Sequence, residues 1–154
     1  MPHKMEQQKA GLIKKLVGEA KKHLPGKQRA TAENFIRQYF EHVPAEDIIG
    51  GDPANLFGAL RAHWRFGASR SPGKAKVRVY NPSPAKMGWQ SQHTVVEVVT
   101  DDMPFLVDSL SAELHRQELF VHKIIHPIFR LRRSQSGNLR EILEPCAPAN
   151  VGGA

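Results

Sequence analysis

Apolar residues are most regular between residues 94 and 133, and their spacing changes twice along that stretch. A β-branched run predicts a strand over residues 94–100 with both faces covered, because such runs are typical of buried strands. A helical period then predicts a helix over about residues 104–118, and an extended pattern predicts a long strand over residues 120–133. The expected inward positions are Leu106, Val107, Leu110 and Leu114 on the helix, and Val121, Ile125, Phe129 and Leu131 on the second strand. Pro127 lacks an amide hydrogen, so we expect a bulge or a sheet edge near it.

The loop between the first of these strands and the helix is the best candidate for a site. It comprises Thr100, Asp101, Asp102, Met103, Pro104 and Phe105. Asp101 and Asp102 precede the helix, where carboxylates cap free amides and favour the positive end of the helix dipole, and Pro104 fits the first turn. Together with Asp108 these carboxylates could form an acid–base set, but no nucleophile accompanies them and capping accounts for the first two.

The first third of the chain predicts three helices. One covers residues 5–24 and carries an apolar stripe beside a face of lysines that includes Lys9. A second begins near Thr31, and a third begins at Asp52 and continues over residues 53–67. The lysine face favours a helix that is packed on one side and solvated on the other, and a basic helix on a membrane or a nucleic acid is the alternative.

Shorter strands and turns occupy most of the remainder. Residues 69–74 indicate a linker, residues 76–80 alternate as a strand, and the prolines of residues 81–84 argue against further strand or helix there. A turn at Gly137 and Asn138 precedes a returning strand over residues 139–143. We therefore divide the chain into an N-terminal helical region (1–68), a strand with a proline-rich connector (69–93), a β-α-β-β unit (94–145) and a flexible tail (146–154).

Composition adds positive charge but no enzymatic motif. The 22 Lys and Arg residues outnumber the 15 Asp and Glu residues and give a formal net charge of +7, which a nucleic acid, an anionic membrane or an acidic partner could use. One cysteine, Cys146, and the lack of a membrane-length apolar run lead us to expect a cytoplasmic protein. The sequence has no glycine-rich phosphate loop, G-x-S-x-G, H-E-x-x-H or C-x-x-C.

Neither the histidines nor the arginines indicate a site by their spacing. His122 and His126 are four residues apart on a predicted strand, which separates them by about 13 Å, too far to share one ion. The arginines between residues 130 and 140 lack aromatic residues for stacking, which favours a solvated strand end over nucleic-acid binding. The residues alone indicate a non-catalytic α+β domain.

Several stretches nevertheless resemble a known family. They are TVVEVVTDDMPFLVDSLSAEL, HRQEL and VHKIIHPIFRLRR, preceded by FIRQYFEHVPAEDI, DPANLFGALRAHWRF, KVRVYNPSP and GWQSQHT. Over about residues 33–144 the chain resembles the N-terminal region of the large bacterial NAD-specific glutamate dehydrogenases, at the first of their ACT-like regulatory domains. The ACT fold is ferredoxin-like, so the resemblance implies an α+β fold in which residues 94–145 supply the first four elements of an antiparallel sheet. The last helix and strand would lie beyond Ala154.

The resemblance also implies a function. The whole enzymes oxidatively deaminate glutamate to 2-oxoglutarate with NAD, so this chain would be a non-catalytic regulatory or assembly fragment that binds no cofactor itself, with NAD serving the parent enzyme. Its partners would be the rest of the parent polypeptide and a second copy, with neither membrane nor nucleic acid expected. An amino-acid-sensing ACT domain that acts allosterically is the alternative function, and a basic nucleic-acid-binding domain is the second alternative.

ACT domains often bind an amino acid at the loop between the first strand and the first helix. The resemblance therefore implies a ligand-binding role for Thr100, Asp101, Asp102, Met103, Pro104, Phe105 and Asp108. Ligand-binding ACT loops typically have glycine after the proline. Phe105 stands at that position here, which favours a packing or assembly role.

Overall fold

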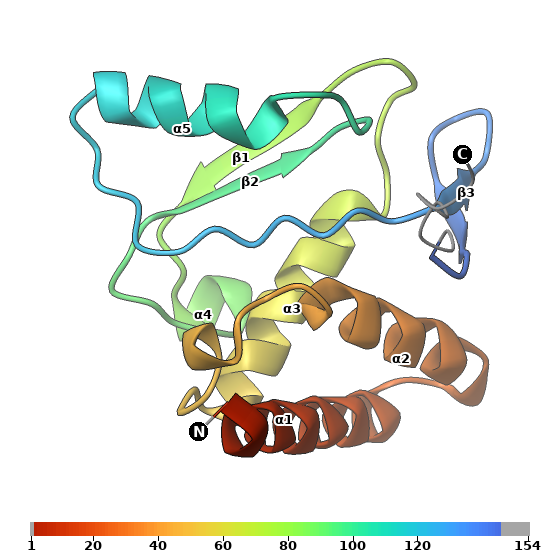
Figure 1. The fold of residues 1–154 in the computed structure, drawn as a ribbon. Coiled ribbons are helices and arrows are strands. Elements are labelled where there is room, and N and C mark those ends of the chain that lie inside the picture. Colours follow the sequence, from red (N-terminus) through yellow and green to blue (C-terminus); the bar gives the residue numbers. More distant parts are fainter. Residues whose placement is uncertain (1, 146–154) are drawn as a thin grey trace, which may run out of the picture.

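The computed structural model describes residues 2–145, so the predicted tail over residues 146–154 lies outside the described residues. Three long helices precede the first strand, and the strands pair antiparallel, which confirms the predicted α+β class (Figure 1). The elements in order are α1 (Pro2–His23), α2 (Gly26–Phe40), the 3-10 helix η1 (Ala45–Asp47), α3 (Pro53–Gly67), β1 (Lys76–Tyr80), α4 (Pro84–Met87), β2 (Val95–Val99), α5 (Leu106–Arg116), β3 (Leu131–Arg133) and β4 (Leu139–Ile142).

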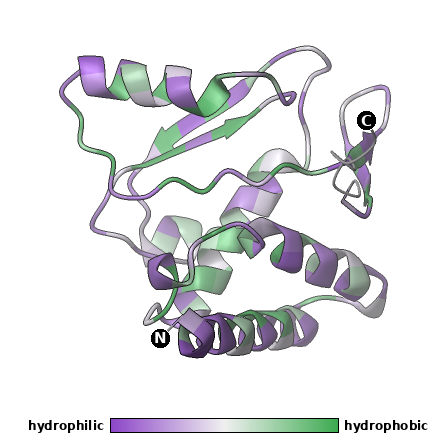
Figure 2. Ribbon diagram, viewed as in Figure 1, coloured by the Kyte–Doolittle hydropathy of each residue, from purple (hydrophilic) through white to green (hydrophobic). Residues whose placement is uncertain are grey.

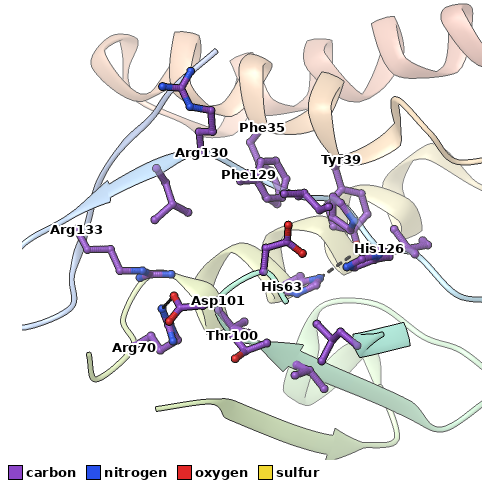
Figure 3. A pocket seen from close by; sticks show the side chains of 18 of the residues that line it. Phe35, Tyr39, His63, Arg70, Thr100, Asp101, His126, Phe129, Arg130 and Arg133 are labelled. Atoms are coloured by element: carbon purple, nitrogen blue, oxygen red, sulfur yellow. Dashed lines mark hydrogen bonds and ion pairs between the residues drawn. The ribbon is translucent and has the colours of Figure 1, made fainter. Parts of the chain in front are cut away.

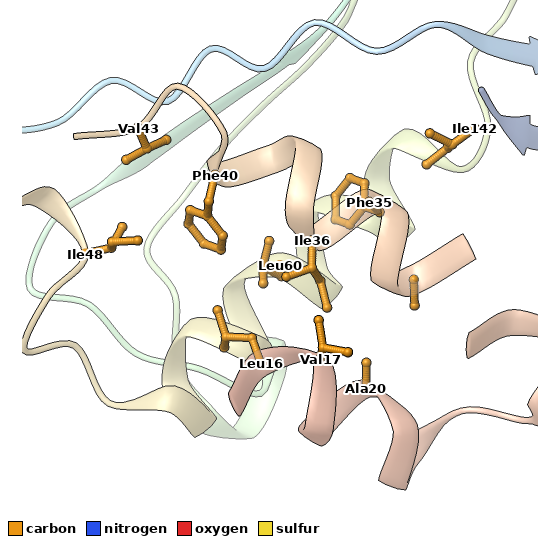
Figure 4. Packing of buried hydrophobic residues seen from close by; sticks show 11 residues of the cluster. Leu16, Val17, Ala20, Phe35, Ile36, Phe40, Val43, Ile48, Leu60 and Ile142 are labelled. Atoms are coloured by element: carbon orange, nitrogen blue, oxygen red, sulfur yellow. The ribbon is translucent and has the colours of Figure 1, made fainter. Parts of the chain in front are cut away.

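The first three long helices enclose the hydrophobic core (Figure 4). Their apolar stripes meet as the helical spacing predicts, and β4 adds one residue from far along the chain. The buried members of this cluster are Leu16, Val17, Ala20, Ala32, Phe35, Ile36, Phe40, Val43, Ile48, Leu60 and Ile142. The predicted start of α3 is also confirmed, because the Asp52 side chain accepts a hydrogen bond from the Asn55 amide at 3.0 Å and Pro53 is the first helical residue.

Two predictions about the helices are wrong. Thr31 does not cap α2, because the helix already begins at Gly26, directly after the turn at Pro25. Lys9 does not belong to the solvated face, because its side chain is buried and its ammonium group donates to the carbonyls of Val43 (2.7 Å) and Glu41 (3.2 Å). Those carbonyls lie where α2 ends, and a cation is favourable at that negative end of the helix dipole.

β1 and β2 pair antiparallel and give the sheet two chemically different faces. Val77 lies opposite Val98, and Val79 lies opposite Val96. Directly opposed residues point to the same side of a sheet, so these four form one surface, here called the valine face. Its members Val77, Val79 and Val96 are 60%, 62% and 44% exposed. The predicted covering of both faces is therefore wrong, because the apolar face is the open one.

The opposite face of this sheet is polar and lies against α3. Glu97 is buried there and accepts hydrogen bonds from Arg78 at 2.5 Å and from the Tyr80 hydroxyl at 2.6 Å. Arg78 also donates to the Ala62 carbonyl of α3 at 3.3 Å and lies over the Phe66 ring. A buried carboxylate needs such partners, and they fix the side of the sheet that α3 covers.

The predicted long strand over residues 120–133 is wrong for most of its length. Residues 120–130 are extended but belong to no strand, and only Leu131–Arg133 pairs, with β4. Adjacent pairs of apolar residues (120–121, 124–125 and 128–129) recur along this segment, separated by histidines, a lysine and a proline (Figure 2). Ile125 and Phe129 pack against the helical core, whereas Val121 is exposed. The order β2, α5, β3, β4 matches the expected β-α-β-β unit, but β2 pairs with β1 and the β3–β4 hairpin is separate.

The β3–β4 hairpin is joined to the helices by hydrogen bonds. Leu139 donates to the Ala68 carbonyl at 2.8 Å, and Arg70 donates to the Gly137 carbonyl at 3.0 Å. Gly137 has a φ of 94°, and a Cβ atom on it would clash with the Arg70 carbonyl. The predicted turn at Gly137 is thus confirmed, and glycine is required there for both conformation and space.

Residues 81–89 hold a helical turn that the prolines were expected to exclude. Pro84 is the first residue of α4, where no amide hydrogen is needed, and the Ser83 hydroxyl accepts from the Lys86 amide at 3.4 Å. Trp89 then approaches α3 so closely that a Cβ atom on Gly58 would lie 2.8 Å from the Trp89 Cβ. The connector therefore packs against α3.

Replacing Glu97 should destabilise the fold strongly. In Glu97→Gln the Arg78 charge loses its buried counter-ion, and we expect a loss of about 3 kcal/mol in the free energy of unfolding, measured by urea denaturation. The matched control is Glu141→Gln. Glu141 also lies opposite an arginine, Arg132, but their 3.8 Å pair is exposed, so its loss should stay below about 0.5 kcal/mol. Equal losses in both variants would contradict the role assigned to Glu97.

Candidate functional site

A cavity of about 520 Å³ lies between the helices, the end of β2 and the extended segment before β3 (Figure 3). Its volume is within the range of about 300–1,000 Å³ that is usual for small-ligand sites. The residues around it are Phe35, Tyr39, His63, Arg70, Val98, Val99, Thr100, Asp101, Asp102, Leu106, Ile125, His126, Pro127, Ile128, Phe129, Arg130, Leu131, Arg133 and Leu143. Most are apolar, and the polar ones include two groups described next.

The apolar wall of the cavity is built from α2 and the extended segment. The rings of Phe35 and Phe129 are stacked, with centroids 5.2 Å apart. Ile125 continues the same side, because alternate residues of an extended chain share one face. Hydrophobic contact with α2, rather than pairing in a sheet, therefore holds this part of the segment in place.

A neutral polar pair lies on the α2 and α3 side of the cavity (Figure 3). The Tyr39 hydroxyl and His63 Nδ1 are 3.1 Å apart and form a hydrogen bond. Burial lowers the pKa of His63, an effect that the nearby Glu97 carboxylate partly opposes. Burial also raises the pKa of Tyr39 above its ordinary value of 10.0, so both groups are uncharged near neutral pH.

Arginine side chains lie near the loop that follows β2. Arg70 donates to the Asp101 carboxylate at 2.6 Å and to the Lys74 carbonyl at 2.9 Å. The Arg133 guanidinium lies close to this pair (Figure 3) and donates to the Gly137 carbonyl at 3.0 Å. Burial, with a further contribution from the Arg70 charge, lowers the pKa of Arg133, while Asp101 acts in the opposite direction. The cavity therefore has a cationic end and an apolar wall.

Comparison with known proteins places this cavity in a family context. The family model described as "Glutamate dehydrogenase, ACT1 domain" matches residues 35–152, more than half of the chain. The chain belongs to this ACT1 domain family. That assignment confirms the resemblance drawn from the DDMPFLVDS stretch and its neighbours.

Curated relatives of this ACT1 chain agree with the family model. The NAD-specific glutamate dehydrogenase of Halomonas elongata is 34% identical over 140 residues, which is 91% of this chain and 9% of that protein. Its counterpart in Pseudomonas aeruginosa is 37% identical over 79% of this chain and 8% of its own length, and that of Mycobacterium tuberculosis is 36% identical over 62% and 6%. The chain thus spans less than a tenth of these relatives. No solved structure matches it.

The ACT1 loop does not keep all its predicted site residues together. Thr100, Asp101 and Asp102 line the cavity, whereas Met103, Pro104, Phe105 and Asp108 do not. The predicted capping by Asp101 and Asp102 is wrong, because Phe105 occupies the N-cap position of α5 with no side-chain hydrogen bond, and Asp101 pairs with Arg70. Pro104 likewise precedes the helix and is not in its first turn.

Phe105 takes the left-handed conformation, with a φ of 63°, and its side chain is 75% exposed. Glycine adopts that conformation most easily, so the backbone here follows the path that glycine after proline would give. The phenylalanine side chain is exposed and does not line the cavity. Phe105, which in the sequence favoured a packing role over ligand binding, therefore leaves the cavity accessible to a ligand.

Sequence reasoning missed most of the ACT1 cavity. The sequence indicates an inward position for Phe129 and a linker for Arg70, and no motif singles out Phe35 or His63 as site residues. Arg133 belonged to a recognised arginine cluster, but periodicity could not show that it turns inward while Arg132 turns to solvent. Within residues 2–145, no three His, Cys, Asp or Glu residues lie close enough to hold a metal ion, and no helix is long and apolar enough to cross a membrane.

The buried His63 should make stability depend on pH. In the unfolded chain His63 has its ordinary pKa of 6.5, whereas burial lowers the pKa of His63 in the folded chain. Above about pH 6.5, His63 is neutral in both states and does not reduce the free energy of unfolding. Below that pH the unfolded chain binds the proton more strongly, so the free energy of unfolding falls by at most about 1.4 kcal/mol per pH unit. Urea denaturation between pH 7.5 and 5.5 should therefore show a shallower loss for His63→Gln than for the unmodified chain. His115→Gln, an exposed control on α5, should match the unmodified chain; a matching slope for His63→Gln would refute the assignment.

Proposed function

We propose that this chain is a regulatory and assembly domain of an NAD-specific glutamate dehydrogenase and is itself non-catalytic. The supporting observation is the ACT1 family match over residues 35–152, within relatives more than ten times as long. In this proposal the parent enzyme acts in the cytoplasm, oxidatively deaminates glutamate to 2-oxoglutarate, and binds NAD elsewhere in its chain.

The chemistry of the cavity supports a non-catalytic role. Tyr39 and His63 are bonded to each other, and Asp101 is bonded to Arg70. Acid–base or nucleophilic catalysis requires a general base within hydrogen-bond reach of a nucleophile or of a substrate proton. The described residues that line the cavity do not include a hydrogen-bonded pair of nucleophile and base with a third residue that orients the base. The arrangement is suited to holding a ligand.

The valine face supports the assembly part of the proposal. Three of its four residues are largely exposed, and α5, which lies across the sheet from α3 in Figure 1, contributes no buried residue. Exposed apolar surface of this kind typically marks a site of protein contact. The two-stranded sheet also leaves strand edges that can pair with another chain. The expected partners are the rest of the parent polypeptide and a second copy of this chain.

A second candidate function is amino-acid sensing at the cavity. Its support is that Thr100, Asp101 and Asp102, from the loop where ACT domains often take ligands, line a cavity of suitable volume. Asp102 forms no ion pair within the described part of the chain, so its carboxylate is available to an amino group. Binding there would order the segment around Phe129 against the helices and so transmit a signal to the surrounding domain.

The purified chain should not oxidise glutamate. Incubated with glutamate and NAD, it should produce no NADH absorbance above a reaction without protein. The matched positive control is the whole Pseudomonas aeruginosa relative under the same conditions. Steady NADH formation by the chain alone would overturn the non-catalytic proposal.

Self-association should depend on the valine face. We expect the molar mass from light scattering to rise above that of a monomer as the chain concentration increases. Val79→Glu should keep the chain monomeric, because a charge on this face opposes its burial. Val121→Glu, an exposed valine in the extended segment, is the matched control and should associate like the unmodified chain. A chain that stays monomeric at every concentration would contradict self-association. The rest of the parent polypeptide would then be the remaining candidate partner for the valine face.

A further inference from the structure

At the cationic end of the cavity two guanidinium groups, those of Arg70 and Arg133, lie beside one ion-paired carboxylate, that of Asp101. Asp101 is the carboxylate that Arg70 contacts, and the Asp101 side chain is 72% exposed, whereas that of Arg70 is 11% exposed. Solvent screens the exposed carboxylate, so its effect on the enclosed guanidinium groups is reduced. Arg133, beside Arg70, therefore lacks a counter-ion of its own among the residues described.

Arg133 also has an unused donor. Nη1 donates to the Gly137 carbonyl, and Nη2 makes no hydrogen bond within the described chain; Nε is enclosed by protein and is also unpaired. Arginine donors in folded proteins are usually paired, so the unpaired Nη2 of this cavity-lining arginine suits an anionic ligand. The planar fork of arginine matches a carboxylate, which accepts two parallel hydrogen bonds from it.

The remainder of the cavity favours an apolar group. Phe35 and Phe129 present stacked rings, and Ile125, Leu131 and Val99 also line the cavity. A phosphate or a dicarboxylate would bring a second negative charge, either into this apolar part or toward Asp102, and either position is unfavourable. One carboxylate attached to an apolar tail fits both parts of the cavity.

We propose that the cavity binds a small monocarboxylate with an apolar tail, whose carboxylate contacts Arg133 and whose tail lies against Phe35 and Phe129. This proposal rests on the sensing function proposed above for the cavity, and it specifies the class of ligand that the cavity binds. Apolar amino acids and carboxylic acids that lack the amino group share this chemistry. Asp102 distinguishes them, because only an amino acid brings a cation to it.

Titration calorimetry of the whole chain tests the ligand class. Isocaproate and leucine carry the carboxylate and the same branched tail, leucinamide lacks the carboxylate, and acetate lacks the tail. Isocaproate and leucine should bind, with leucinamide and acetate at least tenfold weaker. Tighter binding of leucine than of isocaproate assigns the site to amino acids, and equal binding assigns it to carboxylates in general. Leucinamide that binds as tightly as leucine overturns the proposal.

Two arginine variants test the contact itself. Arg133→Gln should weaken isocaproate binding at least tenfold, since it removes a charge-assisted hydrogen bond. The neighbouring Arg132→Gln, exposed and turned the other way on β3, should leave binding unchanged. Unchanged binding in a folded Arg133→Gln overturns the proposal; if that variant does not fold by circular dichroism, the leucinamide comparison decides. If no probe produces heat on titration, both this site and the sensing function are overturned. The non-catalytic and assembly roles are tested independently, by the NADH and light-scattering experiments.

Discussion

The buried ion pair of Arg78 and Glu97 is the contact on which the arrangement of sheet and helices depends. A carboxylate can be enclosed only where partners satisfy it, and here Arg78 and Tyr80 do so while Arg78 also reaches α3. Burial and the hydrogen bond to Glu97 together raise the pKa of Tyr80 to about 12, so that hydroxyl stays a donor. Because this face is packed on α3, the side chains of Val77, Val79, Val96 and Val98 point to the opposite side of the sheet. The exposure of the valine face therefore follows from the packing of the Arg78–Glu97 pair against α3.

The same arrangement produces the cavity. The end of β2 is held near α3, the β3–β4 hairpin is joined to the linker after α3, and the extended segment crosses the space between them. Side-chain hydrogen bonds from Lys76 and Arg78 hold the sheet on α3, and backbone hydrogen bonds join the hairpin to the linker. The segment itself is held by Phe129 and Ile125, which pack on the helices. A ligand that filled the space would therefore contact three separately supported parts of the chain. This is how binding at one site can affect how the domain meets its partners.

Sequence patterns predicted the elements better than their partners. Helical spacing, the Asp52 cap and strand alternation at residues 76–80 are local signals, and the structure follows them. The inward turn of Glu97 and Arg133 depends on contacts with residues far away in sequence, which periodicity cannot register. The extended segment after α5 has a strand's composition but no neighbouring edge, so it forms no ladder. Three of the seven proposed site residues line the cavity, and its aromatic and arginine components come from distant segments that only the fold brings together.

The absence of buried residues from α5 has a consequence for the dynamics of the domain. A helix of eleven residues is marginal in water by itself, and little packing supports this one. Its backbone amides should exchange with solvent through local opening, at a free-energy cost far below that of unfolding the α1–α3 core. Opening of α5 would uncover more of the sheet without disturbing Leu16 or Phe40 at the centre of the helices. The domain thus combines a rigid base with one element that a partner can order upon contact.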